Sequence, residues 1–500
     1  MKIQMIGHAG IFVETQDCKI LMDPTLYDSH MEGIESIYPR REVIYEKIPE
    51  FDVLIISHRH LDHFDIQSLA SLPKNVDVLI PADKLLENCL RDLGYSQIYP
   101  LRDFNEVKIG STHLIATRSE NRVPEYGILF ADPSGVLWNQ VDSDISLETI
   151  RFVKSRYQQI DFLLAPWSPM LQNHYRENRS LSYPYSAYSR WLDNIGLTKP
   201  KAVAPGANGF KFINDSSWLN QVTFPLTREQ FCRDVKIVCP EVGENVFQLD
   251  PGDTLSFFEG QFEYIKGGSQ FVRKLDEQGD DLDFSPVNIN DSIIDNNPDG
   301  YDLKKMRDLI EQEICINIPK FINENKSSLF LEHFHWNVIY QLEIIFPDSN
   351  CKWYFDFSDD EVYAKPERSM FANLFSITTA SSFYSLLNKI KGWDYILSGG
   401  FYGSYNRIYS VTTHGIITPK NYEIIDPLYI KFPYREVFEN IRHQEVEKWK
   451  QVNHNGITPA KSNTLMMKLG NTFVSLKKTN NQDKVKEASA PEGQSKVTHP

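Results

Sequence analysis

Apolar and polar positions alternate with two different periods along the first 260 residues. Short β-rich runs near the N-terminus, closed by glycine or by Asp23-Pro24, predict a β-meander. The continuous apolar run 52–56 predicts a strand that is buried on both faces. Helices are expected at 65–72, 83–93, 147–157 and 181–195, and further strands at 76–80, 107–109, 113–116, 126–130, 136–138, 162–165 and 201–204. Meanders combined with strand–helix alternation indicate an α/β (α+β) chain with two sheets and helices outside them.

The pattern changes near residues 271–302, where polar, acidic and turn-forming residues predict a linker or long surface loop. Beyond it the periodicity returns: we expect a helix at 303–313, strands at 336–346, 352–357 and 361–364, and a hairpin turn at Asp359-Asp360. The sequence from about 461 onward is polar with almost no aromatic residues, which predicts disorder after roughly Leu476. We therefore divide the chain into a first unit at 1–270, a linker at 271–302, a smaller C-terminal α+β unit at 303–460 and a largely disordered tail at 461–500.

With 52 Lys and Arg against 67 Asp and Glu, the 500-residue chain carries a formal net charge of −15. An acidic surface repels nucleic-acid phosphates and anionic lipids, so we expect a small-molecule substrate and no nucleic-acid partner. No apolar run approaches the ~20 residues that a membrane span needs. The six cysteines are scattered and the N-terminus lacks a signal-peptide pattern, which predicts a cytoplasmic protein with reduced thiols. The sequence leaves open whether the chain forms a homo-oligomer.

A cluster of metal-binding residue types, Ser57-His-Arg-His-Leu-Asp-His63, follows directly on the apolar run 52–56. Residues two apart on an extended chain point the same way, so His58 and His60 can share one metal ion. The turn that follows can bring Asp62 and His63 to a second ion nearby. Imidazole nitrogens combined with carboxylate oxygens suit Zn, Fe or Mn. A chance cluster of polar loop residues is the alternative, but three histidines and an aspartate at these spacings rarely occur together by chance.

This motif, together with Gly7-His8-Ala-Gly and Ile20-Leu-Met-Asp-Pro24, resembles the metallo-β-lactamase superfamily over about residues 1–260. The resemblance implies an αββα sandwich with a mono- or dinuclear metal site at the edge of the sheets. The implied metal ligands are His58 and His60 for one ion, Asp62 and His63 for the other, and Asp142 as a bridge between them. Asp144 competes with Asp142 for the bridging position, because both follow the predicted strand 136–138.

Four further segments carry a closer similarity: Asn139-Gln-Val-Asp142, Ser182-Tyr-Pro184, Pro205-Gly-Ala-Asn-Gly-Phe210 and Leu249-Asp-Pro-Gly-Asp253. In order and spacing they resemble the metallo-β-lactamase part of CMP-N-acetylneuraminate hydroxylases. Those enzymes also have a Rieske iron–sulfur domain, whose cluster needs Cys-x-His and Cys-x-x-His ligand pairs. No cysteine of this sequence lies two or three residues before a histidine, so we expect no Rieske domain here.

The superfamily pattern also includes a histidine between the main motif and the bridging aspartate, and a last histidine near the end of the domain. His113 is the only histidine between 63 and 142, and it lies inside a predicted strand. An oxygen ligand from the loop 118–125 can take its place, and the candidates are Glu120, Asn121 and Glu125. For the last histidine the only substitute is His174, because the segment 205–208 has none. His8 is expected beside the ligands rather than among them.

The resemblance implies a metal-dependent hydrolase that uses a metal-bound hydroxide, with Asp62 as ligand and catalytic proton acceptor. The substrate would be an ester, a lactone or a phosphoester. His174, Arg176 and Arg179 suit an anionic or sugar-like substrate, and an amphipathic surface helix is the competing explanation. The expected cofactors are two divalent ions, zinc or iron, with manganese as a further option. One alternative is an iron-dependent oxygenase related to the hydroxylases above, and another is a metal-stabilised binding protein without catalysis.

The C-terminal unit faintly resembles sterol-carrier-type domains in the runs 341–346, 353–362 and 386–400. Such domains pack helices on a sheet around an apolar tunnel, although aromatic residues of this kind more commonly form a core. His333 and His335 alternate before a predicted strand without an accompanying carboxylate motif, so we interpret them as structural residues.

Overall fold

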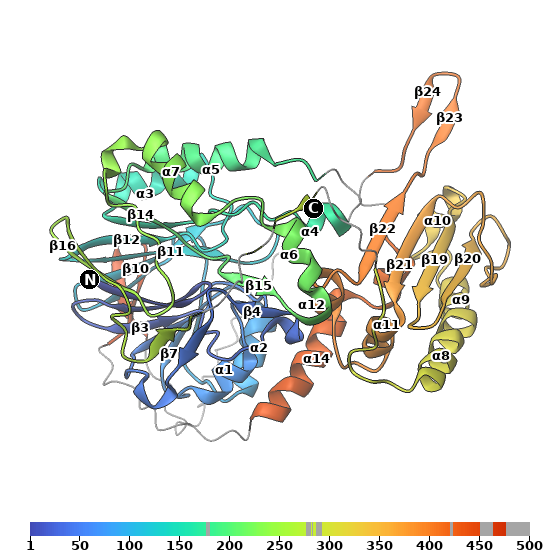
Figure 1. The fold of residues 1–500 in the computed structure, drawn as a ribbon, viewed down its shortest axis with the longest axis horizontal. Coiled ribbons are helices and arrows are strands. Elements are labelled where there is room, and N and C mark those ends of the chain that lie inside the picture. Colours follow the sequence, from blue (N-terminus) through green and yellow to red (C-terminus); the bar gives the residue numbers. More distant parts are fainter. Residues whose placement is uncertain are drawn as a thin grey trace, which may run out of the picture.

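Two eight-stranded β-sheets lie face to face in the N-terminal unit, with helices on both outer faces (Figure 1). The computed structural model describes residues 1–176, 181–276, 282, 284–286, 293–420, 424–450 and 464–476. The first sheet has the order β17-β16-β1-β2-β3-β6-β7-β8, with β1 (Lys2–Gly7), β2 (Gly10–Glu14), β3 (Lys19–Met22), β6 (Val53–Ile55), β7 (Asp77–Pro81), β8 (Ile98–Leu101), β16 (Thr254–Phe258) and β17 (Gln261–Ile265). The second has the order β14-β13-β12-β11-β10-β9-β25-β26, with β9 (Glu106–Ile109), β10 (Thr112–Arg118), β11 (Tyr126–Asp132), β12 (Gly135–Asn139), β13 (Phe162–Ala165), β14 (Ala202–Pro205), β25 (Met466–Leu469) and β26 (Thr472–Ser475).

The inner faces of the two sheets form one apolar core, to which alternate residues of each strand contribute. Helices α1 (Ile66–Ser71) and α2 (Lys84–Asp92) cover the outside of the first sheet. Helices α3 (Leu147–Arg156), α5 (Tyr185–Thr198) and α7 (Arg228–Val238) cover the outside of the second. The predicted αββα sandwich is therefore confirmed.

Capping side chains fix where three of these helices begin. The carboxylates of Asp65 and Asp83 accept hydrogen bonds from backbone N–H groups in the first turns of α1 and α2. The Ser146 hydroxyl does the same for α3. These residue types satisfy N–H groups that have no partner within the helix, which is why the helices begin where the sequence pattern places them.

The strands that carry the main motif end at one edge of the sandwich. Strand β3 is parallel to β6, and it is antiparallel to β2, which is in turn antiparallel to β1. The carboxyl ends of β1, β3 and β6 therefore lie at the same edge of the sheet, although β2 lies between β1 and β3. The residues that follow these three ends are His8, Asp23 and Ser57. Asp142 follows β12 of the other sheet, and its Oδ2 lies 3.2 Å from His63 Nε2. Both sheets thus deliver polar side chains to the same edge.

Two small two-stranded ribbons complete the N-terminal unit. Strand β4 (Glu35–Ile37) pairs with β15 (Phe210–Phe212), and β5 (Arg41–Val43) pairs with β18 (Val272–Lys274). The short helices here are α4 (Gln172–Arg176) and α6 (Asn220–Thr223). Because β18 belongs to this unit, the beginning of the segment predicted as a linker is a paired strand.

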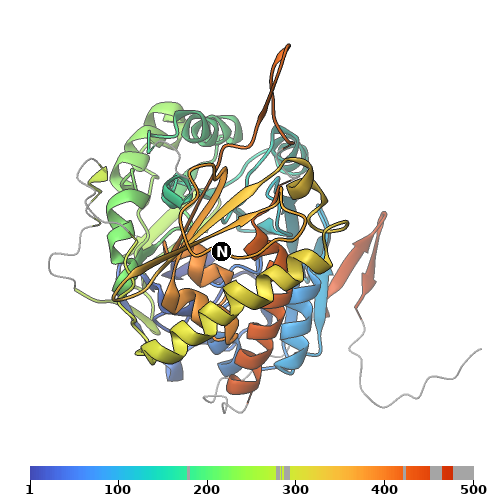
Figure 2. The ribbon, with the colours of Figure 1, turned by 90° about the vertical axis from the view of Figure 1, so that its right-hand side faces the viewer.

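The C-terminal unit is a four-stranded sheet of order β20-β19-β21-β22 with helices packed on it (Figure 2). Its strands are β19 (Ile339–Ile345), β20 (Asn350–Asp356), β21 (Leu374–Thr379) and β22 (Tyr402–Asn406), with a protruding hairpin of β23 (Ser410–Thr412) and β24 (Gly415–Ile417). Its helices are α8 (Leu303–Gln312), α9 (Ile318–Glu324), α10 (Leu331–His335), α11 (Ala380–Leu387), α12 (Trp393–Ser398), α13 (Pro427–Lys431) and α14 (Tyr434–Trp449). Aromatic and aliphatic side chains fill the space between sheet and helices. The likeness to sterol-carrier domains remains a prediction. No helix in the described ranges is long and apolar enough to cross a bilayer.

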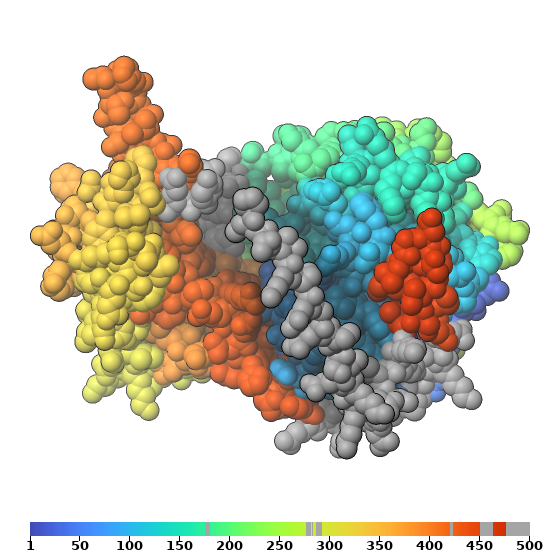
Figure 3. All heavy atoms as spheres, turned by 180° about the vertical axis from the view of Figure 1, so that it is seen from behind, coloured from blue at the N-terminus to red at the C-terminus, as the bar shows by residue number. Residues whose placement is uncertain are grey.

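Two sequence predictions differ from the structure. Residues 361–364 do not form a returning strand. The chain here meets the edge strand β20 only at a single bridge, between Tyr354 and Lys365. The unit assigned as a largely disordered tail, 461–500, also begins with ordered strands: β25 and β26, which precede the disorder expected after roughly Leu476, form a hairpin that pairs with β9, and Figure 3 shows it in red on the N-terminal unit. Its alternating apolar residues cover the end of the sandwich core. Residues 477–500 lie outside the described part of the chain.

The two units share a buried boundary. Helix α14 packs against α1 and α2 (Figure 2). Met31, Ile34 and Leu61 of the N-terminal unit belong to the same apolar cluster as the C-terminal core. Arg442 of α14 forms an ion pair with Glu32, and both side chains are less than one-tenth exposed. Leu61 lies inside the segment Ser57–His63, so the C-terminal unit contacts the loop that carries the candidate metal ligands.

His333 provides a pH-dependent prediction for the C-terminal unit. It is buried, and its ring donates from Nε2 to the Ile425 carbonyl at 2.8 Å. Burial lowers the pKa of His333 from 6.5 to about 4. The unfolded chain therefore binds more protons between these values, and stability present above pH 6.5 is lost as the pH falls toward 4. The loss is of order 3 kcal/mol. We expect His333→Gln to reduce this acid destabilisation in urea unfolding measured at several pH values. His335→Gln, an exposed change on the same helix, should leave the profile unchanged.

Candidate metal centre

The motif after β6 divides its side chains between two sides of one loop. His58, His60 and Asp62 face the edge of the sandwich, whereas Leu61 packs into the C-terminal core. Arg59 forms an ion pair with Asp83 at 3.3 Å. The loop is not extended here: residues 59–63 form a bend and a turn, in which the N–H groups of His63 and Phe64 donate to the His60 carbonyl, so the predicted extended geometry does not account for this division.

His58 and His60 converge as the sequence predicts. His58 Nε2 lies 2.9 Å from His60 Nδ1. Burial, with the charges of His63 and His60, lowers the pKa of His58 well below its usual value. Its ring is therefore neutral near pH 7, with an Nε2 lone pair that can bind a metal ion.

His63 and Asp142 connect this pair to the rest of the site. Asp142 Oδ2 lies 3.2 Å from His63 Nε2 and 3.9 Å from His58 Nε2. Burial lowers the pKa of His63, but the carboxylates of Asp142 and Asp62 outweigh burial and raise this pKa well above its usual value. A metal ion at His63 therefore competes with a proton.

A buried carboxylate behind the ligands fixes the orientation of two imidazoles. Asp23 Oδ2 lies 3.0 Å from His63 Nδ1, so this nitrogen donates to Asp23 and Nε2 is left for a metal. The Ser57 hydroxyl donates to Asp23 at 2.6 Å and lies 2.9 Å from His58 Nδ1. Asp23 directly follows a buried strand, and the sequence analysis used Asp23-Pro24 as a turn and as part of the superfamily resemblance without assigning Asp23 a role at the site.

Three residues at the ends of strands have a left-handed backbone here. The φ angles are 51° at His8, 44° at Asp23 and 52° at Val141, the last directly before Asp142. This conformation is costly for a β-branched residue such as Val141. Strain of this kind is retained where the surrounding structure needs a side chain in one direction, and here all three positions adjoin or supply the polar cluster.

Among the three oxygen-ligand candidates, Glu125 is the one that faces the cluster. Its carboxylate is buried, and burial raises its pKa, a hydrogen bond from Ser119 lowers it and the negative charge of Asp142 raises it further. Asn121 donates from Nδ2 to Glu125 Oε1 at 2.7 Å and to the Asp142 carbonyl at 3.2 Å, so it orients Glu125. Glu120 pairs with Arg118 at the surface.

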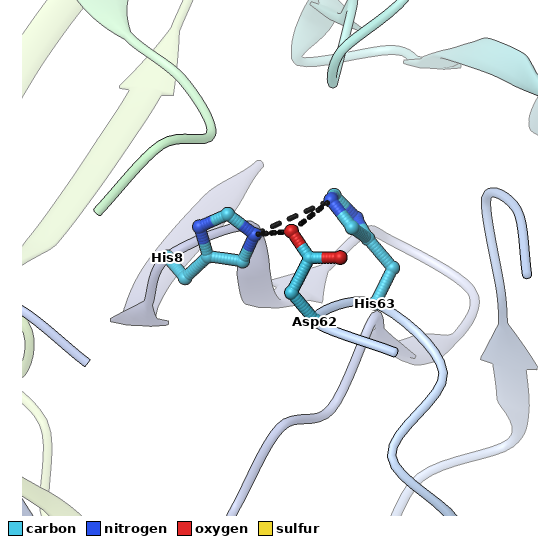
Figure 4. A group of neighbouring side chains, drawn as sticks. All are labelled: His8, Asp62 and His63. Carbon is cyan, nitrogen blue, oxygen red and sulfur yellow. Dashed lines mark hydrogen bonds and ion pairs between the residues drawn. The ribbon is translucent and has the colours of Figure 1, made fainter. Parts of the chain in front are cut away.

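His8 belongs to the polar cluster itself, which the sequence analysis did not expect. Its Nε2 lies 3.0 Å from Asp62 Oδ2 and 3.2 Å from His63 Nε2, and the three side chains point toward one another (Figure 4). Two buried residues that the sequence analysis missed lie behind it. His30 stacks on His8 with 6.3 Å between ring centroids, and His30 Nε2 lies 3.4 Å from Glu35 Oε2. No local sequence signal marks this pair, because the chain fold brings it to the site.

The remaining candidates lie elsewhere. His174 is on α4, which packs against α12 and β22, and it is part of neither group of metal-capable side chains found among the described residues. Arg176 ends α4, and Arg179 lies outside the described residues. Asp144 forms a half-exposed ion pair with Arg190, so the structure favours Asp142 as the bridging residue. His113 pairs with Glu106 on β9.

A cavity of about 550 Å³ opens beside the His8 loop. It shares Tyr38, Trp167, Gly209 and Arg228 with a smaller cavity of about 20 Å³ that reaches His8. The larger cavity therefore lies next to the smaller one on the side of His8, and its lining combines aromatic, aliphatic and polar residues with the guanidinium group of Arg228.

The donor atoms fit divalent cations. Two ligand atoms bound at ~2.1 Å to one tetrahedral ion lie about 3.4 Å apart. The separations here are close to that value: 2.9 Å for His58–His60, 3.0 Å for His8–Asp62 and 3.2 Å for His63–Asp142. Asp142 Oδ1 is buried and receives no hydrogen bond from any described residue. A buried acceptor without a donor is unfavourable, and a cation would satisfy it.

Comparisons with known proteins agree with this fold. Residues 2–132 match the family described as a beta-lactamase superfamily domain. A Mycobacterium tuberculosis protein described as a Rieske 2Fe–2S iron–sulfur protein is 25% identical over 185 residues, which is 34% of this chain and 36% of that protein. The chain thus matches about a third of that relative's length.

A metal-dependent hydrolase of the UPF0173 group from Pyrobaculum arsenaticum is 24% identical over 260 residues, covering 51% of this chain and 99% of the relative. The solved structure of CmlA, a diiron β-hydroxylase from Streptomyces venezuelae, is similar with 17% identity and a TM-score of 0.37, covering 53% of this chain and 54% of CmlA. The N-terminal unit therefore has the sandwich fold of the metallo-β-lactamase superfamily, and residues 2–132 match the model of that superfamily's domain.

Proposed function

We propose that the chain is a metal-dependent hydrolase that binds two divalent cations at the edge of its N-terminal sandwich. One observation carries the proposal: two groups of donor atoms, His8–Asp62–His63 and His58–His63–Asp142, meet at His63. His60 extends the second group through its 2.9 Å approach to His58. The similarity to a metal-dependent hydrolase over 51% of the chain supports hydrolysis as the reaction.

In this proposal the residues of the chain divide the work. His58, His60, His63, Asp62 and Asp142 hold the cations, and Asp23 and Ser57 orient the imidazoles. Bound divalent cations lower the pKa of water to near 7 and stabilise negative charge that develops on the substrate. Asp62 lies at the exposed side of the cluster and accepts a proton during attack. The substrate, an ester, lactone or phosphoester with an anionic or sugar-like part, occupies the cavity of about 550 Å³ beside the His8 loop.

Metal analysis tests the proposal directly. Protein purified without chelators is analysed for bound metals and then assayed on panels of esters, lactones and phosphodiesters. We expect two zinc ions or similar redox-inert ions and hydrolysis of at least one class. Bound metal without turnover on any panel, and without O₂ consumption, would instead indicate a metal-stabilised binding protein.

A second candidate, an iron-dependent oxygenase, is favoured by Glu125. A buried carboxylate stands where the superfamily pattern has a histidine, and oxygen ligands favour harder metals such as iron. The similarity to proteins described as Rieske iron–sulfur proteins also supports this candidate. Two bound irons with a visible absorption band, together with O₂ consumption, would support the oxygenase and contradict the hydrolase.

Under either candidate, Glu125 completes the ligand set of the ion held by His58 and His60. We expect Glu125→Ala to weaken binding of one ion by at least about 10- to 100-fold in chelator competition. Glu120→Ala is the matched control, because Glu120 lies five residues earlier in the same loop and pairs only with Arg118 at the surface. Equal chelator curves for both variants would exclude Glu125 as a ligand.

A further inference from the structure

Three donor atoms from distant parts of the sequence form a nearly equilateral triangle. His8 Nε2, Asp62 Oδ2 and His63 Nε2 are separated by 3.0, 3.2 and 3.5 Å. In a triangle of this size a single point lies about 2.1 Å from all three atoms, which is the length of bonds from zinc to nitrogen and oxygen. A simple ion pair between His8 and Asp62 requires only the first of these contacts.

The backbone around His8 is built to place this ring. His8 has a φ of 51°, a conformation that glycine or asparagine adopts far more readily than histidine. The loop 205–209 packs directly on it: a Cβ atom at Gly209 would lie 3.1 Å from the His8 backbone nitrogen and Cα. The segment in which the superfamily pattern has its last histidine therefore supports His8 here and supplies no imidazole of its own.

We infer that His8 is a terminal ligand of the second cation, together with Asp62 and His63. This inference rests on the proposed metal centre and adds a ligand from the first β-hairpin to it. The atom of His8 that faces the other two donors is Nε2. The neighbouring His30 is a buried histidine that lies in neither donor group, so burial near the site is not enough to make a ligand.

The experiment compares His8→Gly with the wild-type chain after reconstitution with zinc or with iron under anaerobic conditions. Glycine accepts the left-handed backbone, so this variant keeps the hairpin and removes only the ring. Metal content after gel filtration is measured by elemental analysis, and a chelator competition gives the affinity of each ion. His30→Gln is the matched control.

We expect the wild type and His30→Gln to hold two ions and His8→Gly to hold one. In the chelator competition, the affinity of His8→Gly for the second ion should be at least about 100-fold lower than that of the wild type. Added imidazole should fill the space left by the ring and restore the second ion, which a purely structural role of His8 would not produce. Two tightly held ions in His8→Gly, or a wild type that binds a single ion, would overturn the inference. A wild type that binds none would overturn the proposed function instead.

Discussion

Replacing Asp142 with alanine is expected to abolish binding of the shared cation and to lower kcat/KM by about 1,000-fold or more. Asp142 is the carboxylate within reach of both His58 and His63, at 3.9 and 3.2 Å. Its loss leaves both ions short of a ligand, and a metal that stabilises developing charge supplies several kcal/mol, or about three powers of ten in rate. Elemental analysis gives the metal loss, and the substrate panel gives the rate.

Asp144→Ala is the control for this prediction. Asp144 is two residues away and pairs with Arg190 at the surface, so its removal should change neither metal content nor rate. Loss of metal in Asp144→Ala, with full metal in Asp142→Ala, would exchange the roles that the structure assigns to these aspartates.

The second large effect is expected at the boundary between the units. Arg442→Met should lower the free energy of unfolding by about 3–5 kcal/mol, because it leaves Glu32 buried without its partner. Glu32 also accepts a hydrogen bond from the Gly392 N–H at 3.0 Å, so the same carboxylate ties α12 and α14 to the N-terminal unit. Urea unfolding followed by circular dichroism measures the change.

Two further variants separate charge burial from packing. Arg435→Met removes an exposed arginine of the same helix, whose ion pair with Glu439 is at the surface, and should cost less than about 0.5 kcal/mol. The double variant Glu32→Gln with Arg442→Met removes both charges and should regain part of the stability. A double variant as unstable as the sum of the single changes would contradict the role of the buried ion pair.

Features encoded by neighbouring residues could be predicted from the sequence. The apolar run before Ser57 gives a buried strand, and the spacing of His58 and His60 correctly predicts that these two side chains converge. Caps such as Asp65 and Ser146 mark helix starts within one turn. These elements are specified locally, so a single sequence contains enough information about them.

Features that depend on distant contacts could not be predicted. The role of His8 depends on a left-handed backbone and on the loop 205–209, which lies some 200 residues later. The hairpin β25–β26 reads as a polar tail because only its pairing with β9 gives its apolar residues a core to cover. Residues 361–364 have strand-forming composition, but the chain here meets the edge strand β20 only at the bridge between Tyr354 and Lys365. Glu125 could be distinguished from Glu120 only by burial.

The alternation of side chains along the motif has a consequence for how the two halves of the chain can vary. Leu61 lies between two ligands and is embedded in the C-terminal core, together with Met31 and Ile34. A substitution in that core which shifts Leu61 by an ångström would shift His60 and Asp62 with it. Packing in the C-terminal core therefore constrains the positions of the candidate metal ligands in the N-terminal unit.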